Sequence, residues 1–171
     1  MITKRMEEAL NEQINKEAYS AYMYLAMSAY CNSQGFLGFS HWMRMQYQEE
    51  VLHMTKMYDY ILTQGGEVFL KTIEEPPKEY GTPLEIFQKT LEHEQFVTKS
   101  IHQLMGLAME ERDYATQGFL QWYVSEQVEE EASVQDVLNP LRMVGEDKGG
   151  LMMIDQKLGG RMAPSIPAPA N

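Results

Sequence analysis

Residues 48–61 read QEEVLHMTKMYDYI and combine a helical pattern with polar side chains on the apolar face. Glu50, Met54 and Met57 follow one another at steps of four and three residues, the spacing of one face of an α-helix. His53 lies three residues after Glu50 and therefore projects from the same side. A buried carboxylate is costly unless it has a partner, so this face predicts a binding site as well as a core.

The composition indicates one soluble globular domain that acts in a reducing compartment. The chain has 171 residues, a net charge of −11 and 44% hydrophobic residues. Its single cysteine, Cys31, excludes an internal disulfide and a C-x-x-C motif. No signal-peptide core or transmembrane run is evident, and the negative charge disfavours nucleic acid. We expect a cytoplasmic protein with no nucleic-acid or membrane partner.

Glycines and prolines divide the chain into helices, and no stretch shows the alternation of a strand. The pattern predicts helices at 4–32, 38–64, 84–111, 116–144 and, shorter, 149–158. Pro140 is expected to kink or end the fourth helix, because it lacks an N–H and clashes one turn back. We expect one domain over 1–158 and a disordered Pro/Ala-rich tail over 159–171.

The connection from Gly65 to Pro83 sets the topology. It is longer than the two to eight residues that usually join helices in a bundle, and about 17 extended residues reach roughly 55 Å. A helix of the predicted length measures about 40 Å. The connection can therefore cross the whole bundle. The expected fold is all-α, a four-helix bundle of two antiparallel hairpins with one long crossover and a short fifth C-terminal helix.

Each long helix carries a glutamate in the middle of its apolar face. These residues are Glu17, Glu50, Glu94 and Glu130. Glu17 precedes Glu50 by 33 residues and His53 by 36, and Glu94 precedes Gln127 and Glu130 by the same two intervals. When the hairpins fold, the four carboxylates meet at one level. Two divalent cations would neutralise their charge, and oxygen ligands with one imidazole suit iron or manganese. The alternative is a solvated polar seam in a plain bundle.

Three stretches extend this pattern to a known family. They are NEQINKEAYSAYMYLAMSAYC, QEEVLHMTKMYDYI and, most specifically, FLQWYVSEQVEEE at 119–131. Over residues 1–158 the chain resembles the bacterial non-haem ferritins, members of the ferritin-like di-iron class. The resemblance implies a 24-subunit hollow cage that oxidises Fe(II) with O2 or H2O2 and stores a ferric mineral.

The resemblance also implies roles for individual residues. Glu17, Glu50 and His53 match the ligands of one iron, and Glu50, Glu94 and Glu130 match those of a second, with Glu50 bridging. Gln127 matches a residue beside the centre that positions a water or an oxygen species. Tyr24 matches a tyrosine next to the centre, where a hydrogen-bonded core role and a redox role are equally open. A third iron site is matched by Glu49, Glu126, Glu129 and Glu130, although a solvated charge run is the alternative.

Two positions separate this chain from the haem-binding relatives. Bacterioferritins repeat Glu-x-x-His in the fourth helix, where this chain has Glu130. They also carry a haem-ligating methionine at the position of Val51, so no haem is expected. The competing functions are a di-iron or di-manganese peroxidase or catalase that stores nothing, and a DNA-coating mini-ferritin. Mineral capacity and DNA retention in a gel-shift assay distinguish these classes.

Overall fold

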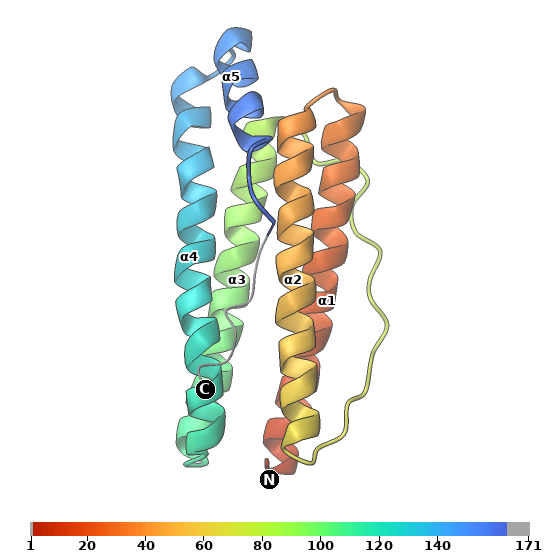
Figure 1. The fold of residues 1–171 in the computed structure, drawn as a ribbon, viewed down its shortest axis with the longest axis vertical. Coiled ribbons are helices and arrows are strands. Elements are labelled where there is room, and N and C mark those ends of the chain that lie inside the picture. Colours follow the sequence, from red (N-terminus) through yellow and green to blue (C-terminus); the bar gives the residue numbers. More distant parts are fainter. Residues whose placement is uncertain (1, 164–171) are drawn as a thin grey trace.

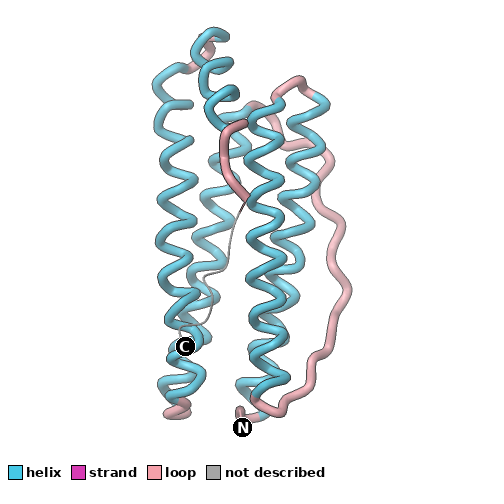
Figure 2. Tube along the Cα trace, viewed as in Figure 1, coloured by secondary structure: helices cyan, strands magenta, loops and turns pink. Residues whose placement is uncertain are grey.

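The computed structural model describes residues 2–163, and these form five α-helices without strands (Figures 1 and 2). The helices are α1 (Lys4–Ser33), α2 (Leu37–Thr63), α3 (Pro83–Glu110), α4 (Tyr114–Val144) and α5 (Lys148–Leu158). This confirms the predicted all-α class and places every helix end within two residues of its expected position. No helix among residues 2–163 is both long and apolar enough to cross a bilayer. The tail for which disorder was predicted spans 159–171, and its residues 164–171 lie outside the described part.

Helix α1 packs along α2, and α3 packs along α4, as two antiparallel hairpins (Figure 1). The segment between α2 and α3 runs the length of the first hairpin, as its length predicted (Figure 2). Asn11 of α1 ties this crossover down, since its Nδ2 donates to the Glu67 carbonyl at 3.0 Å and its Oδ1 accepts from Phe69 N at 2.7 Å. At the far end of the crossover, Tyr80 is only 2% exposed and its ring packs edge-on against the ring of Tyr30.

Local sequence fixes where the helices begin. Thr82 and Glu85 form a reciprocal capping box at the start of α3, with Pro83 in the first turn. Asp113 caps α4 by accepting from Thr116 N at 3.0 Å. The turn into α2 uses Gly35 at a φ of +83°, a conformation that suits glycine.

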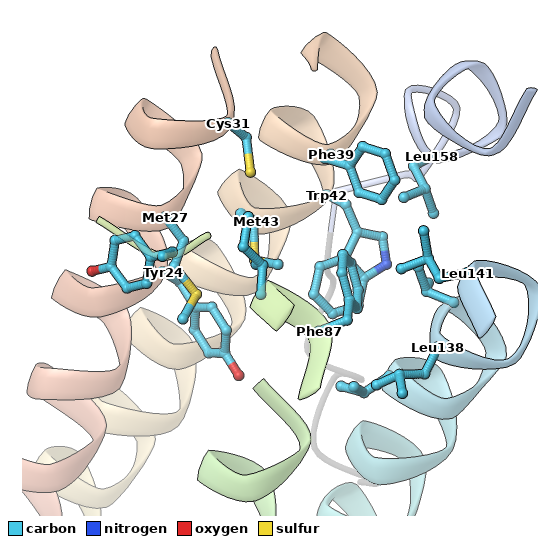
Figure 3. Packing of buried hydrophobic residues seen from close by; sticks show 14 of the residues in the cluster. Tyr24, Met27, Cys31, Phe39, Trp42, Met43, Phe87, Leu138, Leu141 and Leu158 are labelled. Carbon is cyan, nitrogen blue, oxygen red and sulfur yellow. The ribbon is translucent and has the colours of Figure 1, made fainter. Parts of the chain in front are cut away.

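Helix α4 continues through Pro140 to Val144, in agreement with the predicted range of 116–144, so the proline does not end the helix. A proline forfeits one intrahelical hydrogen bond, and here the loss falls close to the C-terminus. Leu138 and Leu141, on either side of Pro140, are both buried in the core. Their packing against α2 and α3 holds the last turn in place (Figure 3).

The short helix α5 folds back onto the start of α2. Gly38 permits this contact, because a Cβ at that position would lie only 1.6 Å from the Asp155 carbonyl oxygen. The Asp155 carboxylate also accepts a hydrogen bond from Phe39 N at 2.9 Å. Leu158 then joins Phe39, Trp42 and Leu141 in the apolar cluster shown in Figure 3.

The apolar core is divided into two clusters. In each long helix, one of the four glutamates lies between them. One cluster includes Tyr24, Met43, Phe87 and Val134, and the other includes Ile14, Met57, Val97 and Tyr123. Along the chain, Glu17, Glu50, Glu94 and Glu130 each fall between a member of one cluster and a member of the other. The bundle therefore has an apolar layer, a polar layer and a second apolar layer along its axis.

Candidate metal centre

Glu17 of α1 and the Glu50–His53 pair of α2 form the tightest group in the polar layer. Each offers one ligand atom, and these atoms all lie within 4.8 Å of one another. The three side chains are 1%, 1% and 3% exposed. Helical geometry places Glu50 and His53 one turn apart on one face, with His53 Nδ1 3.5 Å from Glu50 Oε2.

Two carboxylate oxygens in this group accept no hydrogen bond. Among the described residues, Glu17 Oε2 and Glu50 Oε2 are buried without any hydrogen bond. Buried polar atoms are normally satisfied, and a buried carboxylate oxygen without a donor is a strong exception. Oxygen donors with one imidazole form a donor set that fits a divalent iron or manganese ion. The arrangement therefore matches a cation-binding site better than a packing core.

Glu94 and Glu130 enter the same layer from α3 and α4, and hydrogen-bond donors hold both. Tyr24 donates its phenolic hydrogen to Glu94 Oε1, and Gln127 Nε2 donates to Glu94 Oε2 at 3.2 Å. Gln46 Nε2 donates to Glu130 Oε2 at 2.8 Å. Neither glutamate lies in the compact group formed by Glu17, Glu50 and His53 among residues 2–163. The structure thus brings three expected ligands into one group and holds the other two beside it.

Burial shifts the acid–base behaviour of this layer. It raises the pKa of the Glu50 carboxyl well above the ordinary value, and the charges of Glu94, Glu17 and Glu130 raise it further. Burial likewise raises the pKa of Glu94 to about 7 and that of Glu130 to about 8. The shared charge repulsion shows that all four carboxylates lie close enough to interact. Such a cluster binds a cation more readily than it accepts four negative charges without one.

The remaining acidic candidates flank the layer. Glu49 and Glu126 are partly buried and Glu129 is exposed. Burial raises the pKa of Glu126, the charge of His53 lowers it, and the charges of Glu129 and Glu49 raise it. Glu49 also has a partner that the sequence did not indicate, because Arg161 Nη2 donates to Glu49 Oε2 at 2.6 Å.

Several buried residues that hydrogen-bond to the candidate ligands were not predicted from the sequence. Gln13 Nε2 donates to Glu17 Oε1 at 2.9 Å, and Ser100 in turn donates to Gln13 at 2.5 Å. Gln46, described above, holds Glu130. Tyr123 donates to the His53 carbonyl at 2.7 Å. A signal was present, since Gln13 and Gln46 each lie four residues before a candidate ligand and so share its helix face.

Comparisons with known proteins indicate the family of this chain. The family model of the ferritin-like domain matches residues 7–144. A bacterial non-haem ferritin of Bacteroides fragilis is 44% identical over 161 residues, which cover 94% of this chain and 100% of that protein. One from Escherichia coli O157:H7 is 42% identical over 158 residues, covering 92% and 96%.

Solved structures show the same fold. The crystal structure of an open pore ferritin from the hyperthermophilic archaeon Archaeoglobus fulgidus matches with a TM-score of 0.94 and 53% identity. The match covers 95% of this chain and 100% of that one. Membership of this family supports a role in iron storage. The fold, the buried carboxylate layer and these relatives all lead to the same conclusion. The chain belongs to the ferritin family.

Proposed function

We propose that this protein oxidises Fe(II) at a two-iron centre within each subunit and stores the product as a ferric oxyhydroxide mineral. The observation that carries the proposal is the buried group of Glu17, Glu50 and His53, with two carboxylate oxygens that no donor satisfies. In this proposal iron is the substrate and cargo of the protein. It binds where the fold has concentrated negative charge without counter-charge.

The first iron is assigned to Glu17, Glu50 and His53, and the second to Glu50, Glu94 and Glu130, with Glu50 between the two. Glu50 is suited to a bridging role because the charges of the other three glutamates all act on it. Gln127 holds Glu94 on the side away from Tyr24 and is assigned the positioning of a water or an oxygen species. We assign Glu49, Glu126 and Glu129, together with Glu130, to a third iron site beside the pair.

The chemistry follows from the donor set. Hard carboxylate oxygens stabilise Fe(III) more than Fe(II), so the layer favours oxidation of bound iron. Two Fe(II) ions give up one electron each. These two electrons and two protons reduce one O2 to H2O2, or one H2O2 to two waters. A paired site delivers both electrons to one oxidant, and this is the advantage of two irons close together.

Assembly and location complete the proposal. We assign the chain to a 24-subunit cage, as its relatives' family suggests, with α5 at the fourfold axes. The lone buried Cys31 and the absence of an intrachain disulfide suit the cytoplasm. The net charge of −11 argues against nucleic acid as a partner. Neither haem nor a membrane has a part in this proposal.

Stepwise aerobic addition of Fe(II), followed by near-ultraviolet absorbance, tests the proposal. We expect rapid oxidation of the first few irons per subunit and then soluble uptake of far more. Glu130→Ala should slow the rapid phase by about 100-fold, since one ligand of the second iron is lost. Glu8→Ala, an exposed change on α1, is the matched control. Oxidation that stops at two irons, with precipitation of the excess, would exclude storage and favour a peroxidase.

A further inference from the structure

Residues 159–163, which follow α5, turn back along α2 (Figures 1 and 2). Contacts of Arg161 hold them there. The guanidinium carbon lies 4.4 Å from the centre of the Trp42 ring, an arrangement that favours a cation–π interaction. Arg161 Nη1 lies 3.5 Å from the Trp42 carbonyl oxygen. The Arg161 carbonyl oxygen lies 2.8 Å from His41 Nε2, which donates to it in the matching tautomer. Both the side chain and the backbone of Arg161 are therefore held.

The far end of the Arg161 side chain reaches Glu49. Arg161 Nη2 donates to Glu49 Oε2 at 2.6 Å, a short charge-assisted hydrogen bond. The two side chains are only 20% and 24% exposed, so water screens their charges incompletely. Among the described residues, this is the only ion pair that involves any member of the acidic cluster Glu49, Glu126, Glu129 and Glu130.

The pairing conflicts with metal binding at the same carboxylate. A metal ion on Glu49 Oε2 would need the position that the guanidinium now fills. A metal ion on the other oxygen would lie within about 5 Å of the guanidinium, where two positive charges repel strongly in a partly buried setting. Glu49 can therefore serve one of the two cations well, but not both.

We propose that Arg161 is a tethered counter-cation that competes with iron for Glu49, so that metal binding at the third site and docking of residues 159–163 on α2 exclude each other. The proposal rests on the function proposed above and adds a positioning residue to it. Its consequence is that the third site stays weaker than the two-iron centre. An ion there is readily expelled when Arg161 returns, which suits a site of passage.

Anaerobic calorimetric titration with Zn(II), a redox-inert probe, tests the proposal on the assembled protein. We expect two tight equivalents per subunit and a weaker third. Arg161→Gln should tighten the third equivalent about tenfold and leave the first two unchanged. Lys157→Gln is the control, because it removes a positive charge that lies near Arg161 but is not paired with Glu49. It should leave the affinities of all three equivalents unchanged. Arg161→Lys retains the charge and should keep the third equivalent weak.

The fluorescence of Trp42 supplies a second measurement. If Arg161 had only a structural role, binding of Zn(II) would not change this fluorescence. Trp122→Phe leaves Trp42 as the single tryptophan. Binding of the third Zn(II) should then change the Trp42 emission as the guanidinium leaves the ring, and the change should vanish in Arg161→Gln. The proposal is overturned if Arg161→Gln lowers thermal stability but leaves the third equivalent unchanged, or if that equivalent is missing in both proteins. Failure of the proposed function is distinct, because the two tight equivalents would then be missing or insensitive to Glu17→Ala.

Discussion

Tyr24 donates a hydrogen bond to Oε1 of Glu94 and so joins α1 to α3 across the buried polar layer. Both side chains are fully buried. Burial raises the pKa of the Tyr24 hydroxyl well above its ordinary value, and the charge of Glu94 raises it further. The hydroxyl therefore stays protonated and serves as a permanent donor to Glu94.

Removal of that donor should slow Fe(II) oxidation. Tyr24→Phe leaves Glu94 with Gln127 as its side-chain donor, so we expect the initial oxidation rate to fall about tenfold. Stopped-flow absorbance measures it. Tyr22→Phe, at a 49% exposed position on the same helix, is the control. A variant that loses thermal stability while oxidising iron at the normal rate would leave Tyr24 as a core tyrosine only.

The two glutamines should act on opposite sides of the centre. Gln13→Leu releases Glu17, and Gln46→Leu releases Glu130. Loss of such an orienting partner typically costs 10–100-fold in metal affinity. Zn(II) titration should show one equivalent weakened in each variant, and a different one in the two. Gln103→Leu, at an exposed position of α3, is the control. Equal weakening of both equivalents by either change would contradict the assignment.

The metal-free protein should lose stability as the pH rises. The carboxyls of Glu94 and Glu130 have pKa values raised to about 7 and about 8. A raised carboxyl pKa means that the folded state favours the protonated form, so this contribution is full below about 4.5 and is lost as the pH rises through 7 and 8.

Thermal unfolding of the metal-free protein between pH 5 and pH 8.5 measures this effect. We expect the midpoint to fall with rising pH and saturating Zn(II) to restore it, since a bound cation offsets the buried charges. Glu130→Gln should flatten the pH dependence. A midpoint that rises with pH in the metal-free wild type would contradict the origin of these pKa shifts.

Substitution by alanine should have opposite effects on stability at Gly38 and at Gly106. Gly38→Ala places a Cβ 1.6 Å from the Asp155 carbonyl, so α5 must move away from α2. Gly106 of α3 has open space around the same added atom. Gly106→Ala should therefore stabilise the protein by about 0.5–1 kcal/mol. Limited proteolysis should cut near α5 in the first variant alone, and equal resistance in both would show that α5 docks elsewhere.

Much of the fold follows from the sequence because its helices are long, periodic and clearly punctuated. The 33- and 36-residue intervals also placed four glutamates at one level, and their burial in the structure agrees. The effect of Pro140 was left open, because a proline can kink or end a helix, and the buried Leu138 and Leu141 pack on either side of it where the helix continues. The Glu49–Arg161 pair did not follow either, because it joins residues far apart in sequence through a segment with no helical pattern.

Anomalous diffraction at the iron absorption edge, from crystals loaded anaerobically with Fe(II), locates the bound irons directly. We predict two iron peaks in every subunit, about 3.5–4 Å apart. One should lie among Glu17, Glu50 and His53, and the other among Glu50, Glu94 and Glu130. Iron peaks found only between subunits, or a polar layer without iron at saturating Fe(II), would contradict it.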